Sequence, residues 1–505
     1  MARAINHEIL LARNVQSLSF FPLLRAYGLA YVSTTAPRLL KLLLLLYRKK
    51  SARGNIFASI YSVLAGSFAV RRFPTFCAAL VGGYTFLQWL LRLLFDYASI
   101  PSMGRKVPSK RLRNASHAAS RFLAAVISAW FSLDLLNYKA IAKVDRKKSK
   151  QAAQDQQRHV VNDTGPTLQT AKILDSKISQ ASPPVLAGKT VDLTLLTVTR
   201  ALDSLVVNLC RRSHPSLANT ASASSTLTAI SRYADTFVFA LSSGTVMWAW
   251  FYLPDRLPRA YNKWIGEAAQ VDHRLIDVLR KAHAGEFIYG EDTGQAHILQ
   301  GMCSDYGWPL AWGDPVKTTP IPCEIVHMGT GPSCHWHAAV RFSRAFQFAL
   351  ATNLPLQLLV KARNPSFRAF RRACEEAVRS SAFLGAFVGL FYYGVCLSRT
   401  RLGPRIFSRE TITPMMWDSG LCVGTGCVLC GWSTLIEAEK RRMELALFVA
   451  PRALATLFPR DYNANHFWKE KAAFSLSTAV LFTLAHEDSS RVRGVLGRLI
   501  HLVLQ

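Results

Sequence analysis

The sequence predicts an all-α fold: a multi-pass helical membrane protein built from two homologous halves with polar loops. Half of the 505 residues are hydrophobic and only 18% are charged, against roughly 25% in an ordinary soluble domain. The mean hydropathy of +0.15 agrees with this class. Several apolar segments approach the roughly 20 residues that a helix needs to cross a bilayer, and matched segments recur in the same order.

The formal charge of +30, from 61 Lys and Arg against 31 Asp and Glu, calls for a partner of opposite sign. Basic residues flank apolar segments, as at Arg71-Arg72 and Lys440-Arg441-Arg442. Cations in this position face anionic headgroups, so the predicted partner is a lipid bilayer with such headgroups. No zinc-finger, RNP-like or helix-turn-helix pattern occurs, which argues against nucleic acid. Protein partners or a homo-oligomer stay open.

The ten cysteines are scattered, and several lie inside apolar segments. They do not resemble the framework of a disulfide-stapled secreted domain, and no signal peptide opens the chain. We therefore expect an intracellular organelle membrane in a reducing environment. Arg3, Arg13 and Arg25 against Glu8 resemble a mitochondrial presequence, although an amphipathic surface helix explains them equally well.

Composition divides the chain into seven consecutive segments. They are a basic interfacial N-terminal segment (1–55), a first membrane half (56–138), a polar, disordered loop (139–190), the end of the first membrane half (191–255), a soluble helical connector (256–320), a cysteine- and histidine-rich signature with a kinked helix (321–362), and a second membrane half (363–505). Prolines interrupt the first segment, which favours an interfacial position, and Pro355 is expected to kink the helix of the sixth.

In the first half, Phe76 to Ala98 is the clearest spanning candidate, and Phe57 to Val70 would need its basic end to reach the interface. Ser120 to Leu136 carries small residues on one face, among them Ala125 and Ala129. Such a face lets two helices approach closely in lipid. We therefore assign Ala125 and Ala129 to helix packing.

Later in the chain, Thr236 to Leu253 is a further spanning candidate that ends in aromatic residues typical of a headgroup boundary. Arg259 to Gly301 has the apolar spacing of soluble helices. In the second half, apolar segments such as Ala382 to Leu397 and Trp417 to Trp432 follow one another. Three glycines are assigned to helix packing there: Gly385, Gly420 and Gly424.

Three pairs of segments match in the same order, which predicts an internal repeat. The pairs are Arg200–Leu205 with Arg452–Leu457, Ser128–Trp130 with Cys430–Trp432, and Ala65–Phe68 with Gly385–Phe387. Duplicated membrane folds often place their working surface between the halves.

The stretch from Cys323 to His337 concentrates thiol and imidazole groups. Taken as ligands, Cys323, His327, Cys334 and His337 form the pattern Cys-x3-His-x6-Cys-x2-His, which is shorter than that of a zinc finger. Thiolate sulfur and neutral imidazole nitrogen are good donors to Zn²⁺, so these four are the candidate metal ligands.

Two other interpretations of this stretch stay open. Gly329, Gly331 and Pro332 favour a tight turn, with the cysteines as small buried apolar groups and the histidines as hydrogen-bonding caps. Thiol redox chemistry is the third interpretation. The sequence requires no cofactor, and zinc is the one that this stretch leaves open.

Cys323-Glu324-Ile325, His327 and Ser333-Cys334 resemble the cysteine-rich N-terminal signature of the transmembrane protein 135 family. Tyr261 to Ile265 and Trp312 to Pro315 resemble the fungal branch of that family. Its members are multi-pass proteins of peroxisomes, mitochondria and lipid droplets. The small-residue helices are distantly similar to those of mitochondrial inner-membrane import translocases. The resemblance implies a mitochondrial or peroxisomal membrane.

We expect a non-enzymatic protein of mitochondrial or peroxisomal dynamics, or of lipid or metabolite homeostasis and transport. No catalytic residue is assigned, because Gly-x-Ser-x-Gly, His-Glu-x-x-His and paired intramembrane carboxylates are lacking. The alternatives are a metal- or thiol-dependent membrane enzyme that uses the cysteine and histidine stretch, and a membrane-tethered scaffold.

Overall fold

The computed structural model describes residues 20–48, 56–98, 114–137, 186–213, 225–362, 366–460, 462–488 and 491–504. In these ranges the chain is helical apart from two short strands, β1 (Leu186–Ala187) and β2 (Tyr462–Asn463), which pair antiparallel. The predicted all-α class is confirmed. Most of the predicted loop 139–190 lies outside the described residues.

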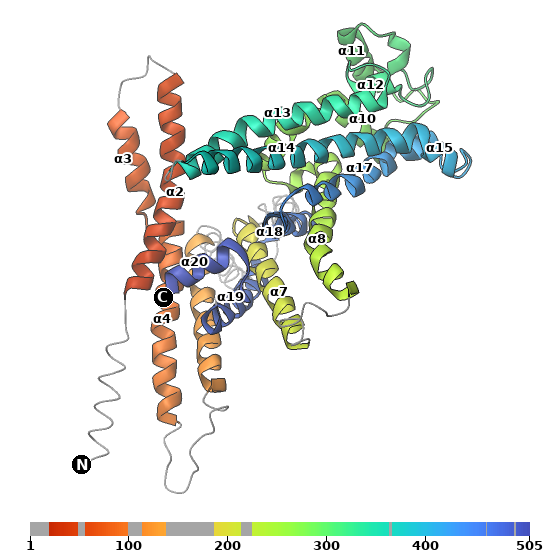
Figure 1. Cartoon of the computed structure of the whole chain (residues 1–505). Helices are drawn as coiled ribbons and strands as arrows, with labels where there is room; N and C mark the ends of the chain where they lie inside the picture. Colours follow the sequence, from red (N-terminus) through yellow and green to blue (C-terminus); the bar gives the residue numbers. More distant parts are fainter. Residues whose placement is uncertain are drawn as a thin grey trace, which may run out of the picture. The chain divides into compact units, whose positions relative to one another are not determined.

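The chain forms two compact units, which are described separately. Unit 1 comprises residues 1–218 and 460–505, and unit 2 comprises residues 219–459. These bounds differ from those of the predicted halves, because 219–255 belongs to unit 2 and 460–505 to unit 1. The helices nearest the two ends of the chain, α2 in red and α20 in dark blue in Figure 1, therefore belong to one unit.

Unit 1 is a helical unit whose elements come from both ends of the chain. Its described helices are α2 (Phe21–Arg48), α3 (Ile56–Ser67), α4 (Phe73–Ala98), Asn114–Asn137, α7 (Val191–Ser213), the 3-10 turn η7 (Ala464–His466), α19 (Phe467–Glu487) and α20 (Gly494–Leu504). Helix α2 packs against α4, and α7 packs against α19.

The helix Asn114–Asn137 packs against α4 through small residues. The Ser128 hydroxyl donates to the Leu80 carbonyl at 2.7 Å, and a Cβ placed on Gly83 would lie 2.5 Å from the Ser128 oxygen. Ala125 and Ala129, which the sequence assigned to helix packing, are fully buried here. The close approach therefore rests on a Gly-Ser contact beside these two alanines.

Unit 2 contains the signature stretch and the connector. Its described helices are α8 (Ser225–Tyr252), α9 (Arg259–Ala269), α10 (His273–Ala284), α11 (Ala296–Tyr306), α12 (Cys323–His327), α13 (Cys334–Lys361), α14 (Phe367–Cys396), α15 (Gly403–Ile406), α16 (Pro414–Met416), α17 (Cys422–Cys430) and α18 (Glu439–Leu457). Short 3-10 or π segments join them: η2 (Pro254–Arg256), η3 (Leu310–Gly313), η4 (Leu397–Arg401), η5 (Trp417–Leu421) and η6 (Gly431–Ile436).

The hairpin of α13 and α14 is the largest contact of unit 2, and Figure 1 shows the two helices side by side. Serine side chains cap both helices: Ser333 accepts from the Trp336 N–H and Ser366 from the Ala369 N–H. Gly385 lets α14 approach α13, because a Cβ there would lie 3.0 Å from the Phe342 carbonyl oxygen. Helix α17 then packs on α14.

The glycines of the α17 region differ in how closely they are approached. A Cβ on Gly424 would make only ordinary contact with Trp248, at 3.7 Å, and one on Gly420 would lie 3.1 Å from the same ring. The close approach to α14 occurs at Gly426, where a Cβ would lie 2.9 Å from the Phe391 carbonyl oxygen. Gly426, rather than Gly424, therefore sets the α14–α17 distance.

Among the described residues, five helices are long and apolar enough to cross a membrane. They are Phe73–Phe95, Asn114–Asn137, Val191–Cys210, Phe367–Ile406 and Pro414–Ile436. The segment Thr236–Leu253 is not among them, because its helix, α8, begins earlier and includes Asp235 and several hydroxyl residues. The predicted segment Phe57–Val70 is also shorter than expected, since α3 ends at Ser67.

Candidate functional site

The signature folds as a short helix, a tight turn and the start of a long helix. Cys323 and His327 are the first and last residues of α12, and Cys334 begins α13. Gly329 and Gly331 adopt φ values of 80° and 96° in the turn, a region that favours glycine. The turn therefore returns the chain so that Cys334 faces the helix carrying Cys323 and His327.

Three of the four predicted ligands converge. One donor atom from each of Cys323, His327 and Cys334 lies within 4.8 Å of the other two. Cys396, at the end of α14, joins them: its sulfur lies 3.4 Å from His327 Nε2, and it interacts with the Cys334 thiol. Cys323 also interacts with the Cys334 thiol. We call Cys323, His327, Cys334 and Cys396 the thiol–imidazole cluster.

The backbone fixes the tautomer of His327. Its Nδ1 lies 2.7 Å from the Gly331 carbonyl oxygen, which can only accept, so Nδ1 carries the proton. The Nε2 lone pair is then directed at the cluster. His327 is fully buried, and burial lowers the pKa of its imidazole.

His337, the fourth predicted ligand, is placed differently. Its ring stacks on His327 with centroids 4.5 Å apart, and its Nδ1 lies 2.6 Å from the Thr330 hydroxyl. That hydroxyl already donates to the His327 carbonyl at 2.9 Å, so it accepts from His337 Nδ1–H. Burial and the neighbouring His327 lower the pKa of His337 to about 3. His337 thus braces the turn.

The Cys323 thiol is held neutral by its surroundings. Burial raises its pKa to about 11, more than the nearby Arg399 guanidinium lowers it. Among the described residues Cys323 forms no disulfide, and neither do Cys334 and Cys396. Three free thiols and one neutral imidazole therefore share a largely dry site.

A buried ion pair holds the segment that leads into the cluster. The Arg399 Nη2 donates to Asp418 Oδ2 at 2.8 Å and to the Ile321 carbonyl at 2.8 Å. The Tyr289 hydroxyl donates to Asp418 and accepts from the Ile321 N–H at 3.0 Å. Ile321, two residues before Cys323, is thus fixed at both its N–H and its C=O.

A second buried cation lies near the two imidazoles of the signature. Arg341 is 2% exposed and lies 4.8 Å above the Tyr392 ring. Its guanidinium donates to the Gln270 carbonyl at 3.0 Å and to the Met328 sulfur. Among the described residues no carboxylate forms an ion pair with it, so its charge is neutralised by none of them.

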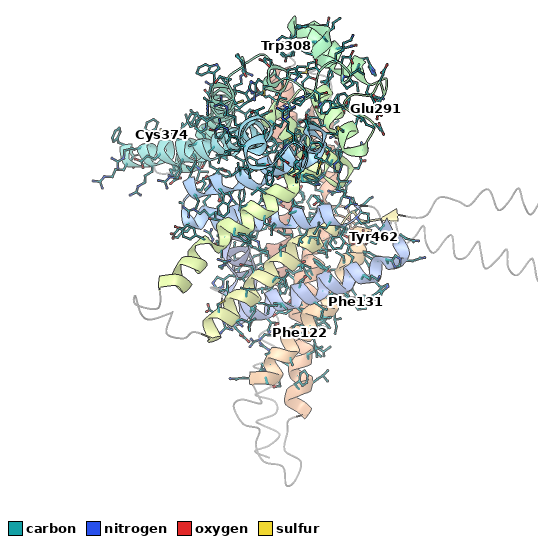
Figure 2. The ribbon with its side chains drawn as sticks, turned by 90° about the vertical axis from the view of Figure 1, so that its right-hand side faces the viewer. Phe122, Phe131, Glu291, Trp308, Cys374 and Tyr462 are labelled. Atoms are coloured by element: carbon teal, nitrogen blue, oxygen red, sulfur yellow. The ribbon has the colours of Figure 1, made fainter. Side chains whose placement is uncertain are left out.

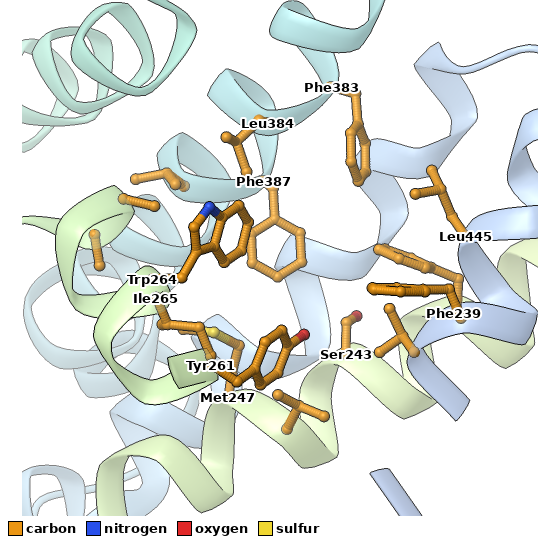
Figure 3. Close-up of a pocket in the computed structure, with 16 residues that line it drawn as sticks. Phe239, Ser243, Met247, Tyr261, Trp264, Ile265, Phe383, Leu384, Phe387 and Leu445 are labelled. Atoms are coloured by element: carbon orange, nitrogen blue, oxygen red, sulfur yellow. The ribbon is translucent and has the colours of Figure 1, made fainter. Parts of the chain in front are cut away.

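Unit 2 also contains an apolar cavity of about 170 Å³. Four helices form its walls: α8, α9, α14 and α18. Figure 3 shows the rings of Tyr261, Trp264 and Phe387 around it. Trp264 is 45% exposed, so this ring also borders the outside of the unit. This cavity could not be predicted from the sequence, because its walls come from helices that are far apart in the chain.

A cation lies at the α18 side of the cavity. The Arg452 guanidinium stands 3.8 Å from the centroid of Phe448 and 5.6 Å from that of Tyr261, and both rings line the cavity. Its neighbours are therefore aromatic rings and a backbone carbonyl of its own helix. An apolar cavity beside a partly exposed guanidinium is suited to an amphiphile with an anionic end.

Comparison with known proteins adds no relative. The chain matches no protein-family model, no curated protein and no solved structure. The resemblance to the transmembrane protein 135 family therefore stays an expectation from the sequence.

Proposed function

We propose that this chain is a non-enzymatic, multi-pass protein of a mitochondrial or peroxisomal membrane that binds an anionic amphiphile in the apolar cavity of unit 2. Such binding would serve lipid homeostasis or transport. The observation that carries the proposal is the cavity itself, whose lining offers few polar groups and is bordered by Arg452.

The lining of the cavity supports an apolar occupant. The cavity is partly open to the outside of the unit and its lining is almost wholly apolar, so an apolar group can enter it. Water gains little from entering, because a buried water needs two to four polar partners. A segment of acyl chain fills such a space and needs no polar partner.

The surroundings of the cavity support an anionic end group. Arg452 is only partly buried, and Arg259 and Lys263 on α9 are exposed. An arginine side chain binds a carboxylate or phosphate with paired hydrogen bonds, which a lysine cannot form in the same geometry. Arg452 is therefore the proposed contact of the end group.

The proposed multi-pass arrangement rests on the five long apolar helices and on the two homologous halves. Similar packing in the two units supports the proposal that the chain contains two homologous halves. Each has a pair of long packed helices, α2 with α4 in unit 1 and α13 with α14 in unit 2. In each, a further helix approaches the pair at a glycine, which lies on α4 in unit 1 (Gly83) and on the approaching helix α17 in unit 2 (Gly426).

The last helix of each half supports the same proposal. Helix α8 follows α7 in the chain but packs against α18, whereas α19 follows α18 but packs against α7. The two halves thus exchange their final helices, which explains why the compact units differ from the predicted segments. Two of the three matched segment pairs agree with this arrangement, because they pair α7 with α18 and the helix Asn114–Asn137 with the end of α17. Ala65–Phe68 does not, because it lies at the end of α3 rather than in α4.

Amphiphile binding is tested with the full chain purified in detergent and titrated with a fluorescent fatty acid. Ala268→Trp fills the cavity from α9 and is expected to weaken binding at least tenfold, about 1.4 kcal/mol. Arg452→Gln should weaken binding of the fatty acid but leave the affinity for the matching fatty alcohol unchanged. Lys440→Gln, at an exposed position of the same helix, is the control with equal charge loss.

Equal affinity of wild type and Ala268→Trp would contradict the cavity as the binding site. A loss of affinity in Lys440→Gln as large as that in Arg452→Gln would reduce the effect to general charge. The membrane part has its own test: alkaline carbonate should leave the protein in the membrane pellet, and tagged protein should coincide with a mitochondrial or peroxisomal marker.

A further inference from the structure

We infer that the thiol–imidazole cluster is a structural Zn²⁺ site of the Cys₃His type, with Cys323, His327, Cys334 and Cys396 as its ligands. The fourth ligand is thus a cysteine from α14, in place of His337. The site would join the signature stretch to the end of a predicted membrane helix.

The spacing of donor atoms fits a tetrahedral ion. Bonds of about 2.3 Å to sulfur and 2.05 Å to nitrogen place a sulfur and a nitrogen ligand about 3.6 Å apart. The observed separation of Cys396 Sγ from His327 Nε2 is 3.4 Å. One donor atom from each of Cys323, His327 and Cys334 lies within 4.8 Å of the other two, and the Cys396 thiol adjoins this group through His327 and the Cys334 thiol.

His327 is already arranged as a zinc ligand. Metal-bound histidines usually donate their second N–H to a carbonyl or carboxylate, which fixes the tautomer. His327 Nδ1–H donates to the Gly331 carbonyl at 2.7 Å, and Nε2 faces the Cys396 sulfur. The glycine turn therefore supplies the outer hydrogen bond of the site.

The charge of the surroundings fits as well. Binding follows Zn²⁺ + 3 Cys-SH + His → [Zn(Cys-S)₃(His)]⁻ + 3 H⁺, so the loaded centre carries one negative charge. Arg341 is buried beside His327 and His337, with no carboxylate partner among the described residues. A buried cation without a counter-ion is costly, and the anionic centre would neutralise it.

Four protein ligands leave no open coordination position, which is the arrangement of structural rather than catalytic zinc. The three elements that meet are α12, α13 and the end of α14. We therefore expect the ion to stabilise unit 2 rather than to perform chemistry.

The test uses the full chain purified in detergent without chelators. We expect one zinc per chain by mass spectrometry, and a cobalt-substituted protein with strong thiolate-to-cobalt bands. Cys396→Ser should lower the zinc content to less than one tenth. His337→Gln should keep the full content. Cys374→Ser should also keep the full zinc content, because Cys374, labelled in Figure 2, precedes Cys396 by about 33 Å along α14.

Cys396→His guards against simple misfolding of the serine variant. It should retain the metal and lower the thiolate-to-cobalt absorbance by about one third, since two of three thiolates remain. The inference is overturned if wild type binds neither zinc nor cobalt, if a disulfide links Cys323 and Cys334 in the purified protein, or if His337→Gln loses the metal while Cys396→Ser keeps it.

Discussion

The two units use apolar helices in different ways. In the three membrane-length segments of unit 1, only 22, 39 and 28% of the apolar 18-residue stretch is buried, whereas the two in unit 2 have 56 and 50%. Exposed side chains such as Phe131, labelled in Figure 2 and 67% exposed, remain on the surface of unit 1. In unit 2 other helices cover the corresponding faces. Similar helices thus leave apolar surface for lipid in one unit and build an interior in the other.

This difference has consequences for polar groups. The covered helices of unit 2 enclose the Arg399–Asp418 pair, whose side chains are 4% and 2% exposed. In unit 1 the Lys471–Asp134 pair, at 2.8 Å, remains 12% and 36% exposed. An interior can position charges and thiols precisely, but it makes each broken polar contact costly. We therefore expect polar substitutions to cost more in unit 2.

The largest expected effect is at the buried pair of unit 2. Arg399→Met leaves Asp418 buried without its cation, and should destabilise unit 2 by about 3–5 kcal/mol. Asp134→Asn removes the exposed pair of unit 1 and should cost about 0–1 kcal/mol. Thermal unfolding in detergent measures both, and equal losses would remove the distinction between the units.

The double variant Arg399→Met/Asp418→Leu sharpens this test. Because it removes both charges, it should recover most of the loss. A double variant as unstable as the single one would show that the cost came from packing or from the lost contact to Ile321.

Glycine contacts give the next effect and are expected in both units. Gly426→Ala forces a Cβ against the Phe391 carbonyl and Gly83→Ala forces one against Ser128, so each should cost about 1–3 kcal/mol. Gly424→Ala meets only Trp248 at 3.7 Å and should be neutral, or stabilising by up to about 1 kcal/mol. The unfolding midpoints of the three variants measure these costs. A larger loss of stability in Gly424→Ala than in Gly426→Ala would contradict the assignment of the α14–α17 contact to Gly426.

Glu470 is a buried acid of unit 1 and tests how costly a polar substitution is there. Glu470 accepts from Thr190 at 2.5 Å, from Thr194 at 3.1 Å and from Tyr462. Glu470→Gln replaces one acceptor oxygen with a donor and should cost about 2 kcal/mol. Glu487 is the control, because it lies on the same helix as Glu470 and forms a partly exposed pair with Arg491. Glu487→Gln should cost less than about 0.5 kcal/mol. Matched losses would assign the effect to charge alone.

The smallest effect is a pH dependence in unit 2. Hydrogen bonds from the Arg274 side chain lower the pKa of Asp272, which caps α10. A lowered pKa in the folded state adds stability that is complete above about pH 4 and is lost as the pH falls through the folded value. Asp272→Asn keeps the cap but should remove this loss of stability below about pH 4, which acid titration of unfolding measures. If the stability of Asp272→Asn falls with acid as steeply as that of the wild type, this assignment to Asp272 is contradicted.

Periodicity and composition predicted the helical class and most helix positions, because these depend on local sequence. They did not predict the unit bounds, since α8 and α19 pack on helices far away in the chain. Nor did they predict that the helix of Thr236–Leu253, α8, begins at Ser225 and includes Asp235.

The candidate site divides in the same way. Cys323, His327 and Cys334 could be found from spacing, because one turn brings them together. Cys396 could not, since it follows His327 by 69 residues and meets it only through the α13–α14 hairpin. His337 matched the ligand spacing, but its ring stacks on His327 and its Nδ1 bonds the Thr330 hydroxyl, while its buried Nε2 has no hydrogen-bond partner among the described residues.

The packing of α7 against α19 bears on how the chain is made. Helix α7 ends at Ser213 and its packing partner α19 begins at Phe467, so about 250 residues must still be synthesised. At 5–20 residues per second this takes roughly 13–50 seconds. Throughout that interval the apolar face of α7 lacks α19 on the ribosome-bound chain. The first part of the protein to be translated is thus the last to be completed, and a helper that shields α7 during translation would favour correct assembly.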